Sequence, residues 1–336
     1  MLFGILLGLG SAFCSSLAYL VSRRYSVHHV EREADQPQWL GPLRLMVTTH
    51  VMLGVVCGGA YLVIRPTGEA QPPDWSWALS SCVFVALFYL IANTLVFFVL
   101  QRTEASRIAP LLGFKVVLLA LVTHFILKDP LVEQQWVAVL LATAAAWVLG
   151  ASGGRLPRTT VVLTVLACAC YVSSDTFIGQ MVPAWMPAGV DYEAAKTTDP
   201  LAVMTAALQG MALSYVWCGL VAVALLPIAK PWRATHWRGS APYAGAWLLA
   251  MVCLYSCFAL TNIVLGTILQ STRGLMSIFI GVLIYKLGHH HIESHAPLKV
   301  VIQRAIAAAL MIVVGIAVLM SLVGLSPALG TFIAGV

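Results

Sequence analysis

The stretch EASRIAPLLGFKVVLLALVTHFIL, residues 104–127, is long enough to cross a lipid bilayer as a helix, because about 20 mostly apolar residues suffice. It carries Lys115 near its middle and Arg107 near its start. An ionised side chain at the centre of a membrane helix costs roughly 2.5–3.5 kcal/mol, so such residues normally face a bundle interior or a wet cavity. A related stretch, LQSTRGLMSIFIGVLI at residues 269–284, carries Arg273.

The composition extends this apolar pattern to the whole chain. Of the 336 residues, 60% are hydrophobic and 10% are charged, whereas a soluble domain has about 25% charged residues. The mean hydropathy is +0.90. The apolar runs do not alternate with polar residues as the strands of a membrane barrel do. We therefore expect an all-α integral membrane protein whose surface faces the lipid bilayer.

Ten apolar segments can be drawn, and most links between them contain turn residues. Of the two longer links, residues 22–42 are charged, and residues 182–200 have room for a short surface helix. The expected transmembrane helices are residues 2–21, 43–64, 77–100, 104–127, 132–150, 159–181, 201–228, 243–266, 268–288 and 300–323.

The second half of the chain repeats features of the first in the same order. A shift of 166 residues places Tyr89 on Tyr255 and Arg107 on Arg273. We therefore expect two five-helix repeats, with the boundary in the sequence LGASGGRL.

The expected repeats are residues 1–150 and residues 151–336. Because five is odd, the second repeat enters the membrane from the opposite face, which makes the repeats inverted. Inverted repeats are typical of transporters, whose substrate sites lie near the bilayer midplane between the copies. An old duplication within an enzyme or a scaffold is the alternative.

Residues 104–150 resemble the fourth and fifth helices of an EamA-type repeat of the drug/metabolite transporter superfamily. The features that carry the resemblance are Pro110, the short link Lys128-Asp129-Pro130 and the helix start Gln135-Trp136. Together with the duplication, the resemblance covers nearly the whole chain. It implies a transporter fold with Lys115 in a central cavity, and it names no substrate. The second repeat departs from the pattern, since Met276 stands where Pro110 does.

Two arguments give opposite predictions for the side of the membrane on which the termini lie. One set of links holds 14 of the 19 Lys and Arg residues and the opposite set holds 4, so the positive-inside rule places both termini outside. The family resemblance implies both termini inside. The cell membrane is the expected location in both cases. The net charge of +6 lies in the links and suits anionic lipid headgroups, not nucleic acid.

Lys115 and Asp175 are the charged residues deepest in the expected helices. Lys115 would bind an anionic group of a small-molecule substrate or couple transport to a proton, and a structural lysine bonded to carbonyls is the alternative. Asp175 matches Arg273 in depth, which predicts a salt bridge or a water-linked pair. A purely structural pair is again the alternative. The duplicate position of Asp175 is Leu17, so Arg107 lacks such a partner. This broken symmetry suits either an asymmetric gate or an arginine that is free to bind substrate.

Further polar residues in the expected helices have functional and structural readings. His50 and His124 could relay protons or simply bond to neighbouring carbonyls, and Asp175 is a further candidate for proton coupling. Asn93 and Asn262 could bind substrate or join helices. Four tyrosines recur and either line a cavity or mark the bilayer interface: Tyr19, Tyr89, Tyr171 and Tyr255.

Cofactor and partner motifs are few. No nucleotide-binding glycine loop is present, so ATP-driven transport within this chain is not expected. The sequence HHHIESH, residues 289–295, contains potential zinc ligands, although a solvated loop is the simpler reading. We expect no metal and no cofactor. Small residues in the fifth and tenth helices favour close approach within the chain or a homodimer.

These observations favour a secondary active transporter of a small polar or anionic metabolite that works by alternating access. The alternative is an integral-membrane enzyme that acts at the bilayer interface with the His289–His295 loop. An enzyme would need clustered acids, bases or metal ligands, and only that loop approaches such a cluster. We therefore expect no enzymatic activity.

Overall fold

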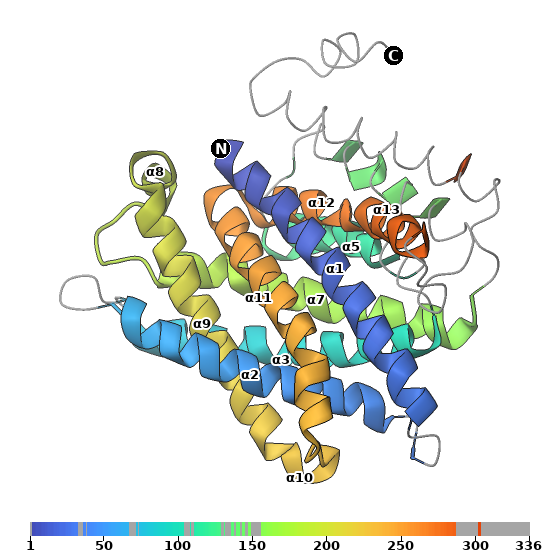
Figure 1. The fold of residues 1–336 in the computed structure, drawn as a ribbon. Helices are drawn as coiled ribbons and strands as arrows, with labels where there is room; N and C mark the ends of the chain where they lie inside the picture. Colours follow the sequence, from blue (N-terminus) through green and yellow to red (C-terminus); the bar gives the residue numbers. More distant parts are fainter. Residues whose placement is uncertain are drawn as a thin grey trace.

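The computed structural model describes a bundle of crossing helices (Figure 1). Within the described part of the chain there is no strand, which confirms the all-α expectation there. The described residues are 2–32, 36–37, 39–66, 72, 74–103, 108, 111–128, 131, 136–137, 139–141, 143–144, 147–148, 156–286 and 302–303.

Seven helical segments among these residues are long and apolar enough to cross a membrane. They correspond to seven of the ten expected helices, and the last of them combines two consecutive helices. The fifth and tenth expected helices lie largely outside the described residues. The segments are α1 (Leu2–Arg32), α2 (Leu40–Ile64), α3 (Trp75–Arg102), α7 (Arg158–Ala184), α9 (Pro200–Ala224), α11 (Ala234–Leu260), and α12 (Ile263–Ser271) with α13 (Arg273–Lys286).

The fourth expected helix differs from a regular membrane helix. Ile108 and Leu111 are helical, and after them come a single 3₁₀ turn, η2 (Leu112–Phe114), then α5 (Lys115–Leu121) and a π-helical turn, η3 (Val122–Ile126). Short 3₁₀ and π turns inside a helix often mark functional sites. Here they lie on both sides of α5, which begins with the buried Lys115.

The boundary between the eighth and ninth expected helices lies earlier than the apolar pattern predicts. The expected break is at residue 267, whereas α11 ends at Leu260 and α12 begins at Ile263. The side chain of Asn262 accepts a hydrogen bond from the backbone N–H of Leu265 at 2.7 Å, so this asparagine is the N-cap of α12. Hydropathy could not reveal this break, because apolar residues flank it on both sides.

The link of residues 182–200, which the sequence analysis found long enough for a short surface helix, does contain one. It is α8 (Tyr192–Thr198), and the Asp191 carboxylate caps its N-terminus. The next helix, α9, is capped in the same way by Asp199, whose side chain accepts a bond from Ala202 N–H at 3.0 Å. Aspartate caps of this kind satisfy backbone N–H groups that a helix leaves without partners. The last turn of α9 leads into one further turn, α10 (Leu226–Ala229).

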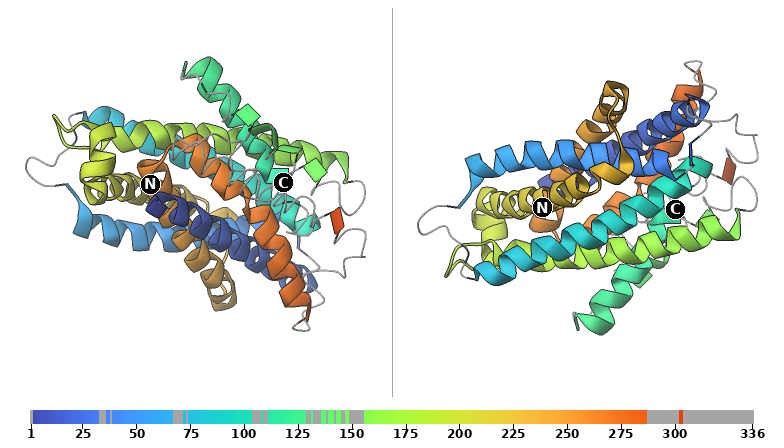
Figure 2. Two further views of the ribbon diagram at one scale, coloured as in Figure 1. Left: turned by 90° about the horizontal axis from the view of Figure 1, so that it is seen from above. Right: turned by 90° about the horizontal axis from the view of Figure 1, so that it is seen from below.

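Three helix pairs form the main contacts of the bundle. α1 packs along α11 (Figure 1), α3 packs along α7 (Figure 2), and α2 crosses α9. At the α2–α9 crossing, Gly54 and Gly219 bring the two backbones together: a Cβ atom on Gly54 would lie 2.8 Å from Cα of Gly219. Only glycine permits this approach, as at other close crossings of membrane helices.

Candidate functional site

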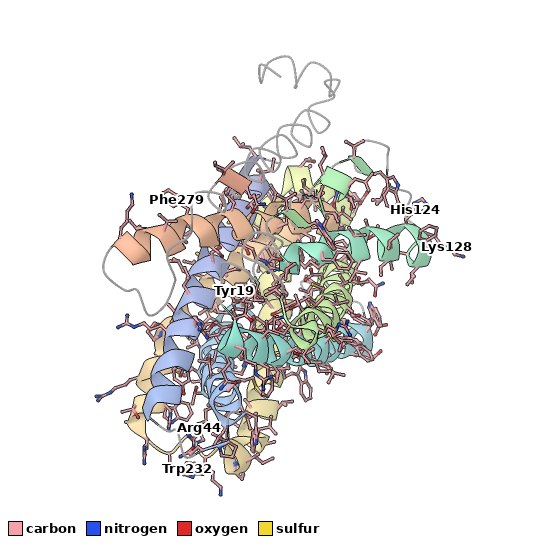
Figure 3. All side chains as sticks on the ribbon, turned by 90° about the vertical axis from the view of Figure 1, so that its right-hand side faces the viewer. Tyr19, Arg44, His124, Lys128, Trp232 and Phe279 are labelled. Carbon is pink, nitrogen blue, oxygen red and sulfur yellow. The ribbon has the colours of Figure 1, made fainter. Side chains whose placement is uncertain are left out.

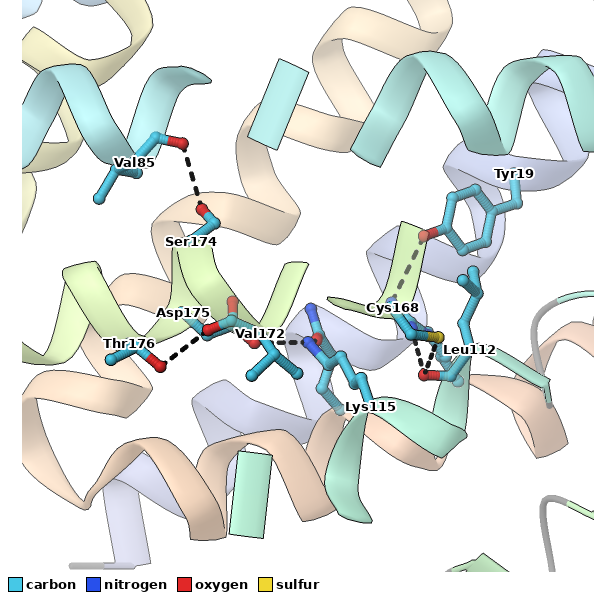
Figure 4. A network of polar contacts seen from close by, with 11 residues as sticks. Tyr19, Val85, Leu112, Lys115, Cys168, Val172, Ser174, Asp175 and Thr176 are labelled. Carbon is cyan, nitrogen blue, oxygen red and sulfur yellow. Dashed lines mark hydrogen bonds and ion pairs between the residues drawn. The ribbon is translucent and has the colours of Figure 1, made fainter. Parts of the chain in front are cut away.

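A buried ion pair forms the centre of the candidate site. Lys115 Nζ, at the start of α5, lies 2.9 Å from Asp175 Oδ2 on α7 (Figure 4). The same ammonium donates to the side-chain oxygen of Gln270 on α12. Lys115 is 2% exposed and Asp175 is 4% exposed. Pairing with hydrogen-bonded partners is what makes two charges tolerable at such depth.

Arg273, the first residue of α13, is a second buried cation beside this pair, and it is 2% exposed. Its Nη1 donates to the Tyr19 hydroxyl at 3.4 Å and its Nη2 donates to the Leu112 carbonyl at 3.3 Å. The guanidinium carbon lies 5.7 Å from the centre of the Tyr19 ring. Nε of Arg273 has no hydrogen-bond partner, and no carboxylate pairs with this residue in the described part of the chain. Arg273 therefore carries the positive charge that the site does not neutralise.

These groups line one cavity, the central chamber, of about 20 Å³. A cavity needs roughly 10–15 Å³ to hold a water molecule, so this conformation has space for water and none for a metabolite. The lining contains two cations and one anion among aromatic side chains, which favours an anionic ligand. The lining residues are Tyr89, Lys115, Tyr171, Ser174, Asp175, Ile178, Tyr215, Trp247, Met251, Leu254, Tyr255, Gln270 and Arg273.

A hydrogen-bond network outside the chamber lining, formed by His50 and Asn93, holds two tyrosines of the chamber in place. His50 Nδ1 lies 2.7 Å from the Met46 carbonyl, and a carbonyl only accepts, so this nitrogen carries the proton. His50 Nε2 then accepts from the Tyr89 hydroxyl at 3.0 Å. Asn93 donates to the Tyr89 hydroxyl at 3.2 Å and accepts from that of Tyr171 at 3.3 Å. His50 is fully buried and both ring nitrogens have partners, so in this state it fixes the position of Tyr89.

One expected contact differs in the structure. The sequence analysis predicted a direct salt bridge or a water-linked pair between Asp175 and Arg273, but Asp175 forms its ion pair with Lys115 instead. The direct bridge is therefore wrong, although Asp175 and Arg273 do line the same chamber. Matching depth could not reveal this choice, because α5 brings a second cation to the same level. A water-linked pair stays a prediction.

The structure separates the remaining candidates by position. Tyr89, Tyr171 and Tyr255 line the chamber, whereas Tyr19 contacts it through Arg273. Asn93 lies in the supporting network, while Asn262 is an exposed helix cap.

His124, a candidate for proton coupling, is not among the residues that line the chamber. His124 lies at the periphery, near Lys128 (Figure 3), and its ring contacts those of Phe125 and Trp136. Arg107 and the His289–His295 loop lie outside the described residues. Among the residues that are described, no group of three or more potential ligands could hold a metal ion.

Sequence reasoning missed several residues of the chamber. Gln270 lies three residues before Arg273, at the start of the polar stretch QSTR that follows an apolar run. Its helical spacing of three from Arg273 was the available signal. Trp247 donates from Nε1 to the Tyr215 hydroxyl at 2.9 Å, and both side chains line the chamber. Nothing in the sequence around Trp247 or Tyr215 distinguishes an aromatic residue that lines a cavity from one that simply packs between helices.

Known proteins match parts of this chain. The sequence profile of the EamA-like transporter family matches residues 2–151. A probable 4-amino-4-deoxy-L-arabinose-phosphoundecaprenol flippase subunit ArnE of Pseudomonas fluorescens (strain Pf0-1) is 36% identical over 81 residues, which are 23% of this chain and 71% of that protein. A flippase subunit of the same description from Pseudomonas savastanoi pv. phaseolicola (strain 1448A / Race 6) is 29% identical over 76 residues, 23% of this chain and 61% of that protein.

A solved structure resembles the whole fold. It is a crystal structure of a protein that is 16% identical in sequence, and the similarity covers 94% of this chain and 96% of that chain with a TM-score of 0.55. At this level of identity, the similarity concerns the arrangement of helices and not the cargo or the mechanism.

Proposed function

The chain belongs to the EamA-like transporter family, and from this premise we propose that it is a secondary active transporter that moves a small anionic substrate by alternating access. The observation that carries the proposal is Arg273, a buried cation in the central chamber without a carboxylate partner among the described residues. A buried charge is costly when it has no counter-ion. An anionic substrate supplies that counter-ion each time it binds.

The contacts of the bundle support two inverted five-helix repeats, residues 1–150 and 151–336. Gly54 and Gly219, which touch at the α2–α9 crossing, are 165 residues apart, close to the shift of 166 that places Tyr89 on Tyr255. In this scheme α7 and α11 are the first and third helices of the second repeat. The first helix of each repeat then contacts the third helix of the other, as α1 with α11 and α7 with α3. The second helices, α2 and α9, contact each other at the symmetry axis between the repeats.

The chamber would then lie between the repeats, since each contributes to it. Lys115 comes from the first repeat, whereas Asp175 and Arg273 come from the second. A site at the contact of inverted copies is exposed to either side of the membrane when one copy tilts against the other. The Lys115–Asp175 ion pair joins the two copies, so it would form or break during that motion. Whether it forms would depend on what occupies the chamber.

The size of the chamber supports a conformational cycle. Small-molecule sites usually have volumes of about 300–1,000 Å³, and the chamber has about 20 Å³. This small volume supports the assignment of the described conformation to a closed state of the proposed cycle, with substrate entering through a more open one. The two flippase-subunit relatives carry a phospho group in the name of their cargo, which agrees with an anionic group at Arg273.

The test starts with purified protein and a panel of anionic metabolites, because a ligand that binds the folded state raises its thermal stability. Stabilising compounds are then assayed for uptake and exchange in proteoliposomes, with and without a pH gradient. Lys115→Ala should abolish transport while the protein stays folded. The matched control is Lys196→Ala, because Lys196 forms a surface pair with Glu193 at 2.7 Å. Normal transport by Lys115→Ala, or no anion-dependent stabilisation by any compound, would refute the proposal.

A further inference from the structure

A second cavity, the lateral crevice, lies next to the central chamber and has the opposite chemistry. It has a volume of about 140 Å³ and an almost entirely apolar lining. An apolar cavity of about 150 Å³ accommodates a benzene ring, so the crevice suits a short length of hydrocarbon chain. Its lining residues are Leu111, Phe114, Thr143, Trp147, Val161, Thr164, Val165 and Cys168.

The crevice faces the lipid side of the bundle. Trp147 is 75% exposed and Val165 is 42% exposed. Both belong to segments expected to span the membrane, where exposed apolar side chains contact hydrocarbon. A chain of a lipid or of an amphipathic molecule therefore reaches this cavity without crossing water.

The crevice and the chamber follow each other along one face of α7. Val161, Val165 and Cys168 line the crevice, and Tyr171 and Asp175 line the chamber. The spacing of three and four residues keeps them on a single helix face. Cys168 and Tyr171 are about 4.5 Å apart along the helix axis, so the two cavities adjoin.

A short backbone segment, which we call the partition, lies between the two cavities. The Leu112 carbonyl accepts from Cys168 Sγ at 3.8 Å and from Arg273 Nη2 at 3.3 Å (Figure 4). Phe114 lines the crevice, and the next residue, Lys115, lines the chamber. The partition is the 3₁₀ turn η2, where the backbone departs from a regular α-helix. The Leu112 carbonyl also accepts from the Lys115 backbone N–H. An anion that takes over Arg273 would remove one of these three hydrogen bonds.

We infer that the lateral crevice holds the hydrocarbon tail of an amphipathic anionic substrate whose headgroup occupies the central chamber at Arg273. This inference rests on the proposed function and narrows its substrate class to anionic amphiphiles. The tail provides affinity through apolar burial, and the charge of the headgroup selects the chamber. The η2 turn is the segment that the substrate displaces when head and tail are both in place.

The experiment measures thermal stabilisation of the purified full chain by ethyl phosphate, octyl phosphate and octanol. Each methylene buried in the crevice increases affinity roughly fourfold. Burial of only two or three of the six additional methylenes of octyl phosphate should therefore make it bind about 16- to 64-fold more tightly than ethyl phosphate. Val165→Trp fills the crevice and should remove this difference. Leu166→Trp is the matched control, because Leu166 is its neighbour on α7, is 50% exposed and does not line the crevice. If Val165→Trp does not fold, Val161→Trp replaces it.

The other outcomes separate the two proposals. Equal affinities of the wild type for ethyl and octyl phosphate would overturn the tail site and leave the anion site intact. In a second outcome, octanol binds as tightly as octyl phosphate and Val165→Trp loses this binding. The crevice would then bind a membrane lipid chain independently of the chamber. That result would overturn the proposed link between the crevice and the chamber. Absence of binding by both phosphates would overturn the anion site itself, and this inference with it.

Discussion

Lys115 and Asp175 form an ion pair of 2.9 Å across 60 residues of sequence, and Arg273 lies in the same chamber with no carboxylate partner among the described residues. The chamber thus holds one anion between two cations. The two members of the pair are for this reason not equivalent, and their removal should have unequal effects.

Asp175→Asn should lower the free energy of unfolding by about 3–5 kcal/mol, because it leaves two buried cations without an anion. Lys115→Met should cost less, because Arg273 remains available to Asp175. Denaturation of the purified protein in detergent measures both values. The surface pair Lys196–Glu193 is the control, and its loss should cost about 1 kcal/mol or less. A larger loss in Lys115→Met than in Asp175→Asn would contradict this account of the chamber.

Arg273→Gln should reduce the affinity for an anionic ligand by roughly tenfold to a hundredfold, because a hydrogen bond to a charged group contributes about 1.5–3 kcal/mol. Arg273→Lys keeps the charge and should retain part of the affinity. Titration of the ligand found in the stabilisation screen measures both. Unchanged affinity in Arg273→Gln would remove this residue from the binding site.

Gly54→Ala should destabilise the protein by about 1–3 kcal/mol, because the new methyl group would lie 2.8 Å from the backbone of Gly219 and force α2 away from α9. Gly59→Ala, in the same helix, is the control, since no atom lies within 4 Å of its added Cβ. The control should be neutral or slightly stabilising, because alanine favours a helix more than glycine does. Thermal unfolding in detergent compares them, and equal effects would show that the crossing tolerates a side chain.

Asn93→Ala and Asn262→Ala should have different consequences although both residues lie in apolar surroundings in the sequence. Asn93→Ala leaves the buried hydroxyls of Tyr171 and Tyr243 without their acceptor, at a cost of about 1–3 kcal/mol each. It should also weaken ligand binding, because Tyr171 lines the chamber. Asn262→Ala removes a helix cap worth about 1 kcal/mol and should leave ligand affinity unchanged. Ligand titration with each variant decides the matter.

Asp74 makes the N-terminus of α3 sensitive to acid. Hydrogen bonds from Trp77 N–H and the Ser76 hydroxyl hold the pKa of its carboxyl below the ordinary value. The capping stabilisation is therefore complete above the pKa of the unfolded state, about 3.9, and is lost as the pH falls through the lower folded-state pKa. Amide hydrogen exchange in the first turn of α3 should accelerate over that range. In Asp74→Asn the acceleration should disappear, and its persistence would assign the effect to another group.

Sequence reasoning succeeded for the features that lipid surroundings impose on a chain. An apolar run must form a helix in lipid, and a charge within such a run must be buried, which is why Lys115 and Asp175 could be selected without coordinates. The same rule has limits. The break at Asn262 is a hydrogen-bonded cap inside an apolar region, so hydropathy placed the end of α11 several residues too late.

The sequence by itself predicted which apolar segments form helices and which charged residues they bury, because the length of an apolar run and the cost of a buried charge both follow from the order of residues along the chain. Tertiary structure alone decided that Asp175 meets Lys115 and not Arg273, that Gln270 joins them, and that Phe114 and Lys115 line different cavities. The physical reason is rotation: the direction in which a side chain leaves its helix is set by contacts with neighbouring helices and by the local 3₁₀ turn at Leu112–Phe114. Hydropathy is a property of position along the chain, so it gives no information about the direction in which a side chain leaves its helix.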